Sequence, residues 1–278
     1  MNYQKLLEQI HKKKSFLCVG LDSDINKIPQ FLRENINPIL DFNKAIIDAT
    51  APYVVAYKLN TAFYEVLGYE GWLQLQSTIN YIKFNHPDIL VIADAKRGDI
   101  GNTSYQYAKA FFEIMDADAV TVAPYMGKDS VEPFLKYKDK WIIILNLTSN
   151  ESASDLQTLH IEENGDLVYE HMLKKALEWG ATCNKSMFVV GATKAESLMF
   201  VRKIVPDHFL LIPGIGAQSG SLEEVAKYGF NEYCGLIVNN SRGIIFASNE
   251  KDFPKVAREK ALEMQQKMEE ILRKNFII

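Results

Sequence analysis

The chain has 278 residues, of which 47% are hydrophobic and 24% charged, and its formal net charge is −4. This length suits one large domain, such as a (β/α) barrel of about 250 residues. The acidic balance argues against a dedicated nucleic-acid-binding protein, because such proteins carry a basic excess. No apolar run reaches the ~18 residues of a membrane span, so we expect neither nucleic acid nor a membrane as a partner.

The three cysteines, Cys18, Cys183 and Cys234, contain no C-x-x-C pair. An odd number of cysteines without paired spacing argues against a disulfide framework and against a structural zinc site. A reducing cytosol fits this pattern, so we expect a cytoplasmic protein. The five histidines contain no H-x-x-x-H pair and indicate no metal site either.

Eight apolar runs rich in Val, Ile and Leu predict β-strands. Continuous apolar runs are typical of strands that are buried on both faces of a parallel sheet. The predicted strands are residues 16–21, 53–59, 89–93, 119–122, 141–147, 187–190, 209–212 and 235–238.

Helical patterns lie between these strands. They cover residues 38–50, 71–85, 103–115, 130–137, 168–180, 195–205 and 222–228. A repeating strand–helix order with eight strands predicts a (β/α)8 barrel, with an open doubly wound sheet as the alternative.

Two segments depart from the repeat. Asn164-Gly165 between short alternating runs predicts a small hairpin inserted near 154–169, after the fifth strand. Apolar residues at mostly helical spacing predict a C-terminal helix over 254–276 that packs on the barrel or on a partner. Because no linker divides the chain, we expect a single domain over 1–278.

The strongest candidate for a site follows the strand 89–93. Asp94 and Lys96 are two residues apart and would share one strand face, and Asp99 follows just beyond. Nearby carboxylates favour the charged form of a lysine, which makes Lys96 a proton donor. A Schiff-base enzyme would need a neutral amine instead. A surface ion-pair network is the alternative interpretation.

Lys58 interrupts the apolar strand 53–59, which is uncommon for a lysine without a partner. We expect it to pair with Asp94 and Asp99, with a strand-end lysine that reaches water as the alternative. Asp22 follows the first strand. In a barrel these positions meet at the carboxyl ends of the strands, where active sites lie.

Two loops indicate a phosphate site. Pro-Gly-Ile-Gly-Ala-Gln-Ser-Gly at 213–220 follows the seventh strand, and Asn-Ser-Arg-Gly at 240–243 follows the eighth. Glycines allow backbone N–H groups to approach a phosphate, and loops after strands seven and eight of a barrel frequently hold one. Arg242 offers a bidentate guanidinium. Ordinary βα turns are the alternative, and the glycine pattern is not that of a Walker loop.

Asp-Ala-Lys-Arg-Gly-Asp-Ile-Gly-Asn-Thr at 94–103 resembles the signature of the orotidine 5′-phosphate decarboxylase family, in its longer bacterial (type 2) subgroup. Matching segments occur in the same order at 20–22, 57–65, 148–150, 213–218 and 241–242. The resemblance implies a homodimeric (β/α)8 barrel. It would convert orotidine 5′-monophosphate into UMP and CO2, the last step of de novo UMP synthesis, without a metal or an organic cofactor.

The resemblance also implies roles for individual residues. The charged catalytic array would comprise Lys58, Asp94, Lys96 and Asp99, with Lys96 as the proton donor to C6 of the pyrimidine. Asp99 would enter the partner's site together with Ile100 and Thr103. The substrate contacts would be Asp22 to the ribose, Ser149 to the pyrimidine, Pro213 in the base pocket, and Gln218 and Arg242 to the phosphate.

One position departs from the subgroup pattern, because Glu151 stands where proline is expected after Thr148-Ser149-Asn150. This loosens the expected backbone of the loop that carries Ser149.

Two other functions compete with the decarboxylation of orotidine 5′-monophosphate. A metal-dependent decarboxylase of a keto-sugar phosphate, or a hexulose-phosphate aldolase, would need an acidic magnesium ligand where Lys58 stands. A non-catalytic nucleotide-binding barrel would gain little from four charged residues.

Overall fold

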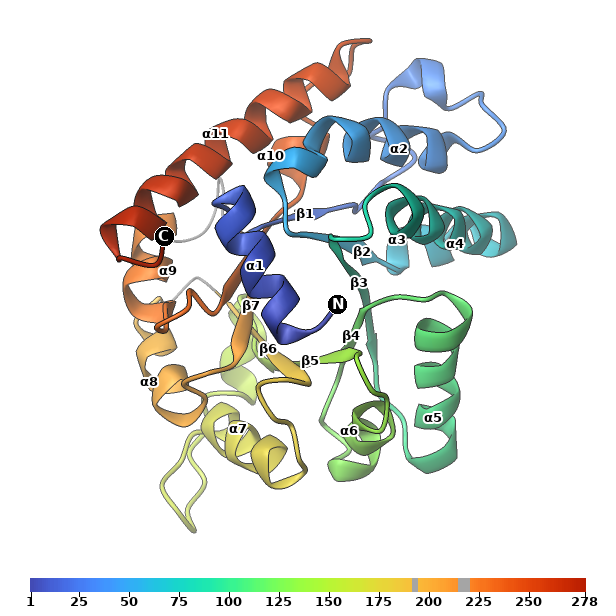
Figure 1. The fold of residues 1–278 in the computed structure, drawn as a ribbon. Coiled ribbons are helices and arrows are strands. Elements are labelled where there is room, and N and C mark those ends of the chain that lie inside the picture. The colour runs from blue at the N-terminus through green and yellow to red at the C-terminus, as the bar shows by residue number, and fades with distance from the viewer. Residues whose placement is uncertain (192–194, 215–220) are drawn as a thin grey trace.

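The strands pair in sequence order, and β1 also pairs with β8, so that the sheet closes into a parallel barrel (Figure 1). This computed structural model describes residues 1–191, 195–214 and 221–278. The closed ring confirms the (β/α)8 prediction and excludes the open doubly wound sheet. Its strands are β1 (Leu17–Gly20), β2 (Ala56–Asn60), β3 (Leu90–Arg97), β4 (Ala119–Val122), β5 (Trp141–Leu147), β6 (Ser186–Val190), β7 (Phe209–Pro213) and β8 (Leu236–Asn240).

Helices surround the ring of strands and bury its outer face (Figure 1). They are α1 (Tyr3–Lys13), α2 (Pro38–Thr50), α3 (Ala62–Glu65), α4 (Gly68–Asn85), α5 (Gly101–Lys109), α6 (Lys128–Leu135), α7 (Val168–Glu178), α8 (Ser197–Ile204), α9 (Leu222–Gly229), α10 (Arg242–Ile245) and α11 (Phe253–Lys274). In the part of the chain that the structure describes, no helix combines the length and apolar character needed to cross a membrane.

Some predicted boundaries are wrong. The strand expected from residue 53 begins at Ala56, because a 3₁₀ turn at Ala51–Tyr53 continues α2. The strand expected to end at residue 93 continues to Arg97, so Asp94 and Lys96 lie inside β3. The helix expected over 103–115 begins at Gly101, and its last turn is a π-helix, Ala110–Ile114.

The sequence prediction missed α1, which covers the amino end of the barrel (Figure 1). The Trp141 indole N–H, at the start of β5, donates to the Met1 carbonyl over 2.8 Å. The Tyr3 ring packs on Phe209, the first residue of β7, with ring centroids 5.2 Å apart. Because α1 closes this end, a substrate has access at the carboxyl ends of the strands.

The segment between β5 and α7 leaves the barrel as a loop. An antiparallel bridge between His160 and Leu167 closes it, and Gly165 takes the positive φ of 75° that its turn requires. The C-terminal α11 packs on α2, where the Phe253 and Phe42 rings stack with centroids 5.3 Å apart.

Candidate active site

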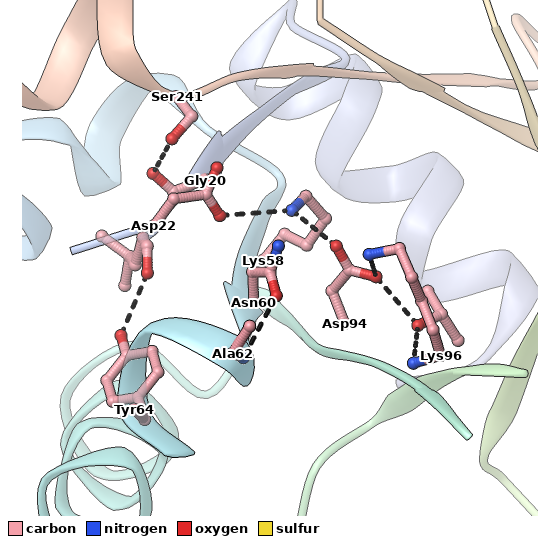
Figure 2. A network of polar contacts seen from close by, with 11 residues as sticks. Gly20, Asp22, Lys58, Asn60, Ala62, Tyr64, Asp94, Lys96 and Ser241 are labelled. Atoms are coloured by element: carbon pink, nitrogen blue, oxygen red, sulfur yellow. Dashed lines mark hydrogen bonds and ion pairs between the residues drawn. The ribbon is translucent and has the colours of Figure 1, made fainter. Parts of the chain in front are cut away.

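A chain of ion pairs crosses the carboxyl ends of β1, β2 and β3 (Figure 2). Asp94 lies between two lysines: Lys58 Nζ is 3.0 Å from Asp94 Oδ2, and Lys96 Nζ is 2.7 Å from Asp94 Oδ1. Lys58 Nζ also lies 3.5 Å from Asp22 Oδ1. The structure therefore brings together four of the residues that the sequence singles out.

Strand register explains why Lys58 and Asp94 meet. Gly20 on β1 pairs with Lys58 on β2, and Asn60 on β2 pairs with Asp94 on β3. Since Lys58 and Asn60 are two residues apart, all four positions face the same side of the sheet. That side is the barrel interior, so the two charged groups are directed toward each other.

Burial divides this array into a hidden part and an accessible part. The Lys58 and Asp94 side chains are 6% and 9% exposed, whereas that of Lys96 is 49% exposed. The Lys96 ammonium is thus the end of the array that a substrate can reach. Apolar residues in place of such a buried ion pair often stabilise a fold equally well, so the presence of these charges favours a functional explanation.

The paired charges hold one another in their ionised forms. Burial by itself would raise the pKa of Asp94, but the Lys58 and Lys96 ammonium groups lower it to about 2. Burial would likewise lower the pKa of Lys58, but the Asp94 and Asp22 carboxylates outweigh it and raise the pKa above its ordinary value. Lys58 and Asp94 are therefore both charged at neutral pH.

Asp94→Asn should destabilise the protein in a pH-dependent way. A carboxylate with a depressed pKa contributes stability above its ordinary pKa, and this contribution disappears as the pH falls through about 2. We expect the variant to be about 2 kcal/mol less stable than the wild type at pH 6. Urea unfolding should show this difference shrinking between pH 4 and pH 2.5. A constant difference would contradict the ion-pair assignment. Asp116→Asn, which removes an exposed carboxylate paired with Lys140, is the matched control.

The residues expected to bind substrate lie at the same end of the barrel. Pro213 ends β7 and is partly exposed, and Arg242 begins α10 with an exposed side chain. Ser241 Oγ donates to the Gly20 carbonyl over 2.9 Å, which fixes the loop after β8 against β1. Gln218 lies outside the described residues.

The loop that carries Ser149 is fixed by contacts that the sequence did not predict. The Thr148 N–H donates to Gln157 Oε1 over 2.8 Å, and Gln157 Nε2 donates to Thr148 Oγ1 over 2.8 Å. A Cβ on Gly191 would lie 2.8 Å from the Ser149 nitrogen, so a glycine is required there. Ser149 is exposed, and Glu151 opens a 3₁₀ turn. Gln157 thus anchors Thr148 in this loop, although no sequence pattern marks it.

Asp99 does not join the array within this chain. Its Oδ1 accepts the N–H of Ile100 over 2.7 Å, and no ion pair among the described residues includes Asp99. The expected contact between Lys58 and Asp99 is therefore wrong for a single chain. Thr103 lies exposed on the first turn of α5.

Sequence reasoning also missed Thr121 on β4. Its hydroxyl donates to Asp94 Oδ1 over 2.9 Å and accepts the backbone N–H of Lys96 over 2.8 Å. A threonine is common in β-strands, so the sequence gives no sign of this contact, and only the pairing of β3 with β4 in the structure reveals it. No group of three or more His, Cys, Asp or Glu side chains placed to hold a metal is found in residues 1–191, 195–214 and 221–278.

Comparison with known proteins agrees with this geometry. The model of the orotidine 5′-phosphate decarboxylase / HUMPS family matches residues 15–253. The orotidine 5′-phosphate decarboxylase of Flavobacterium johnsoniae is 60% identical over 276 residues, which cover 99% of this chain and 100% of that protein. That of Phocaeicola vulgatus is 58% identical over 272 residues, covering 98% of this chain and 99% of the relative.

Among solved structures, the OMP decarboxylase of Leishmania donovani superposes with a TM-score of 0.83 at 35% identity. The match covers 98% of each chain. With a family model that spans most of the sequence and relatives of the same length, the chain belongs to the orotidine 5′-phosphate decarboxylase / HUMPS family.

Proposed function

We propose that this chain decarboxylates orotidine 5′-monophosphate to UMP and CO2, as the carboxy-lyase of pyrimidine biosynthesis. The observation that carries the proposal is the buried Lys58–Asp94–Lys96 array, whose one accessible member is an ammonium group. Family membership and the names of the bacterial relatives point to the same reaction.

The chemistry demands a fixed positive charge. Loss of CO2 leaves the bonding electron pair on C6 of the pyrimidine, without an adjacent carbonyl to delocalise it. An ammonium that is already oriented stabilises this carbanion as it forms. Lys96 then breaks one of its N–H bonds, the proton forms the new C6–H bond, and Lys96 is left as a neutral amine.

Asp94 and Lys58 support this step. Asp94 would lie near the departing carboxylate, where repulsion raises the energy of the bound substrate and is relieved when CO2 leaves. Lys58, held charged by Asp94 and Asp22, keeps the Asp94 carboxylate oriented. The reaction therefore needs no organic cofactor. A divalent cation at Asp94 would face two ammonium groups.

The remaining residues would bind the nucleotide. Asp22 would accept hydrogen bonds from the ribose hydroxyls, and Ser149 and Pro213 would contact the base. Arg242, together with Gln218, would bind the phosphate. Binding energy from the phosphate, remote from C6, can serve to close the site and exclude water.

Arg242→Ala should lower kcat/KM by about 10²- to 10³-fold, because a charge-assisted bidentate contact to the phosphate is lost. The fold should persist, since the Arg242 side chain is exposed. Initial rates with orotidine 5′-monophosphate measure the effect, and Arg258→Ala on α11 is the matched control. Unchanged kcat/KM in Arg242→Ala would refute the phosphate assignment.

We also propose that the active enzyme is a homodimer in which Asp99 completes the partner's site. Exposed apolar side chains gather in the segments that follow β2, β3 and β4, and Val66 and Tyr125 are 77% and 81% exposed. Ile100, beside Asp99, is also exposed. Such residues beside a site suit burial against a second copy of the chain.

The ultraviolet absorbance change on mixing the protein with orotidine 5′-monophosphate tests the function directly. Turnover that survives EDTA supports the proposal. Turnover that EDTA abolishes would favour a metal-dependent relative. Tight binding of UMP without turnover would favour a nucleotide-binding barrel. Lys58 argues against the first of these alternatives, because an ammonium repels a divalent cation.

A further inference from the structure

Thr121 connects the two central members of the charged array. It lies on β4, it is fully buried, and its hydroxyl contacts both Asp94 and Lys96. We propose that Thr121 is a positioning residue that sets the direction of the Lys96 ammonium, and this inference rests on the proposed decarboxylase function. None of the sequence motifs includes it.

The first step concerns the backbone of Lys96. Its φ is +46°, in the left-handed region that residues other than glycine rarely adopt. The pairing of β3 with β4 shifts register between Ala93 and Arg97, so the strand is irregular where Lys96 lies. The Lys96 N–H donates to the Thr121 hydroxyl over 2.8 Å. This bond satisfies a donor that the irregular ladder would leave unpaired.

The second step concerns the carboxylate. Asp94 Oδ1 accepts from both the Thr121 hydroxyl, at 2.9 Å, and Lys96 Nζ, at 2.7 Å. Asp94 Oδ2 accepts from Lys58 Nζ at 3.0 Å. With three donors around it, the carboxylate has one orientation. The Lys58 contact alone would leave the plane of the carboxylate free to turn.

Together these bonds form a closed ring of contacts. It runs from the Lys96 N–H to the Thr121 hydroxyl, on to Asp94 Oδ1, and back to Lys96 Nζ. The backbone of Lys96 is thus bonded to the Thr121 hydroxyl directly, and its ammonium is linked to the same hydroxyl through Asp94 Oδ1. Because a misplacement of about 1 Å can lower a rate 10²-fold, such a ring would affect the proton transfer itself.

The chemistry of threonine suits this position. A hydroxyl can donate one hydrogen bond and accept another at the same oxygen, which valine cannot do. The β-branched side chain also restricts rotation about χ1, so the hydroxyl is held in one direction. Val120, next on β4, is buried on the opposite face of the strand and provides a comparison.

Thr121→Val, which keeps the shape and removes the hydroxyl, tests the proposal. We expect kcat to fall about 10- to 100-fold while KM changes less than about threefold, because the contacts proposed to bind the ribose and the phosphate lie outside the ring. Thr121→Ser restores the hydroxyl and should recover kcat to within about threefold. Val120→Ala should lower the melting temperature and leave kcat near that of the wild type.

Equal kcat in Thr121→Val and the wild type would overturn the proposal, and so would a serine variant as slow as the valine variant. If Thr121→Val does not fold, Thr121→Ala replaces it, since it also lacks the hydroxyl. Failure of the proposed function would be visible separately, as a wild-type protein that forms no UMP. A crystal structure of the valine variant then decides: an unmoved Lys96 ammonium refutes the positioning role.

Discussion

Lys96→Ala should lose decarboxylation by at least about 10⁴-fold, because two effects depend on this one side chain. General acid catalysis typically contributes about 10²- to 10⁴-fold, and a preorganised charge that faces a developing anion adds about 10²- to 10³-fold. The Lys96 ammonium is the exposed end of the array, whereas Lys58 and Asp94 are buried, so neither can take its place beside the substrate. The production of UMP measured over hours is the appropriate assay.

One further variant separates the effect of the charge from that of proton transfer, and a second variant is a control. Lys96→Arg keeps a positive charge but donates a proton poorly, so it should remain far slower than the wild type. Lys109→Ala removes an exposed lysine from α5 and should leave turnover unchanged. Turnover of Lys96→Ala near the wild-type rate would exclude Lys96 as the proton donor.

The barrel could be predicted because its strands are continuous apolar runs that repeat in order with helices. The central array could be predicted for a related reason. Lys58 interrupts one apolar run and Asp94 directly follows another, so the parallel register of β2 and β3 brings them to one end of the barrel. Helical spacing predicted a C-terminal helix over 254–276, which the structure has as Phe253–Lys274, but α1 was missed although Leu6 and Ile10 are fully buried.

The details that tune the site depend on pairing between distant segments. Thr121 and Gln157 are polar residues without a motif, and only the closed barrel and the folded loop place them against Lys96 and Thr148. The irregular pairing of β3 with β4 could not be predicted either. Alternation of side chains put Asp94 and Lys96 on one strand face. In the structure the two side chains do meet, but Lys96 has a left-handed backbone conformation inside β3, so regular alternation does not describe this contact.

The second large expected effect is the loss of activity when Asp99 is replaced. The place of Asp99 in the proposed dimer can be tested without a structure of the complex. Its carbonyl accepts from Ser104 Oγ at 2.6 Å, and its carboxylate contacts the N–H of Ile100. The loop is thus ordered, although Asp99 forms no ion pair in the described part of its own chain. An ordered acidic residue beside exposed Ile100 is what a site shared between two copies requires.

Asp99→Asn and Lys96→Ala should each be nearly inactive alone and should complement each other when refolded together in equal amounts. In a mixed dimer, the site of the Asp99→Asn subunit has an intact Lys96 and receives an intact Asp99 from its partner. Half of the dimers are mixed and each has one complete site, so activity should reach about one quarter of the wild-type value.

Refolding the wild type with an equal amount of the double variant gives the reciprocal control. If Asp99 serves the partner's site, mixed dimers contain no complete site, and activity should fall to about one quarter of that of an all-wild-type sample. If Asp99 serves its own chain, every wild-type subunit stays active and about one half remains, while the two single variants fail to complement. Sedimentation of each sample must show dimers, because a monomer with full activity would contradict the shared site.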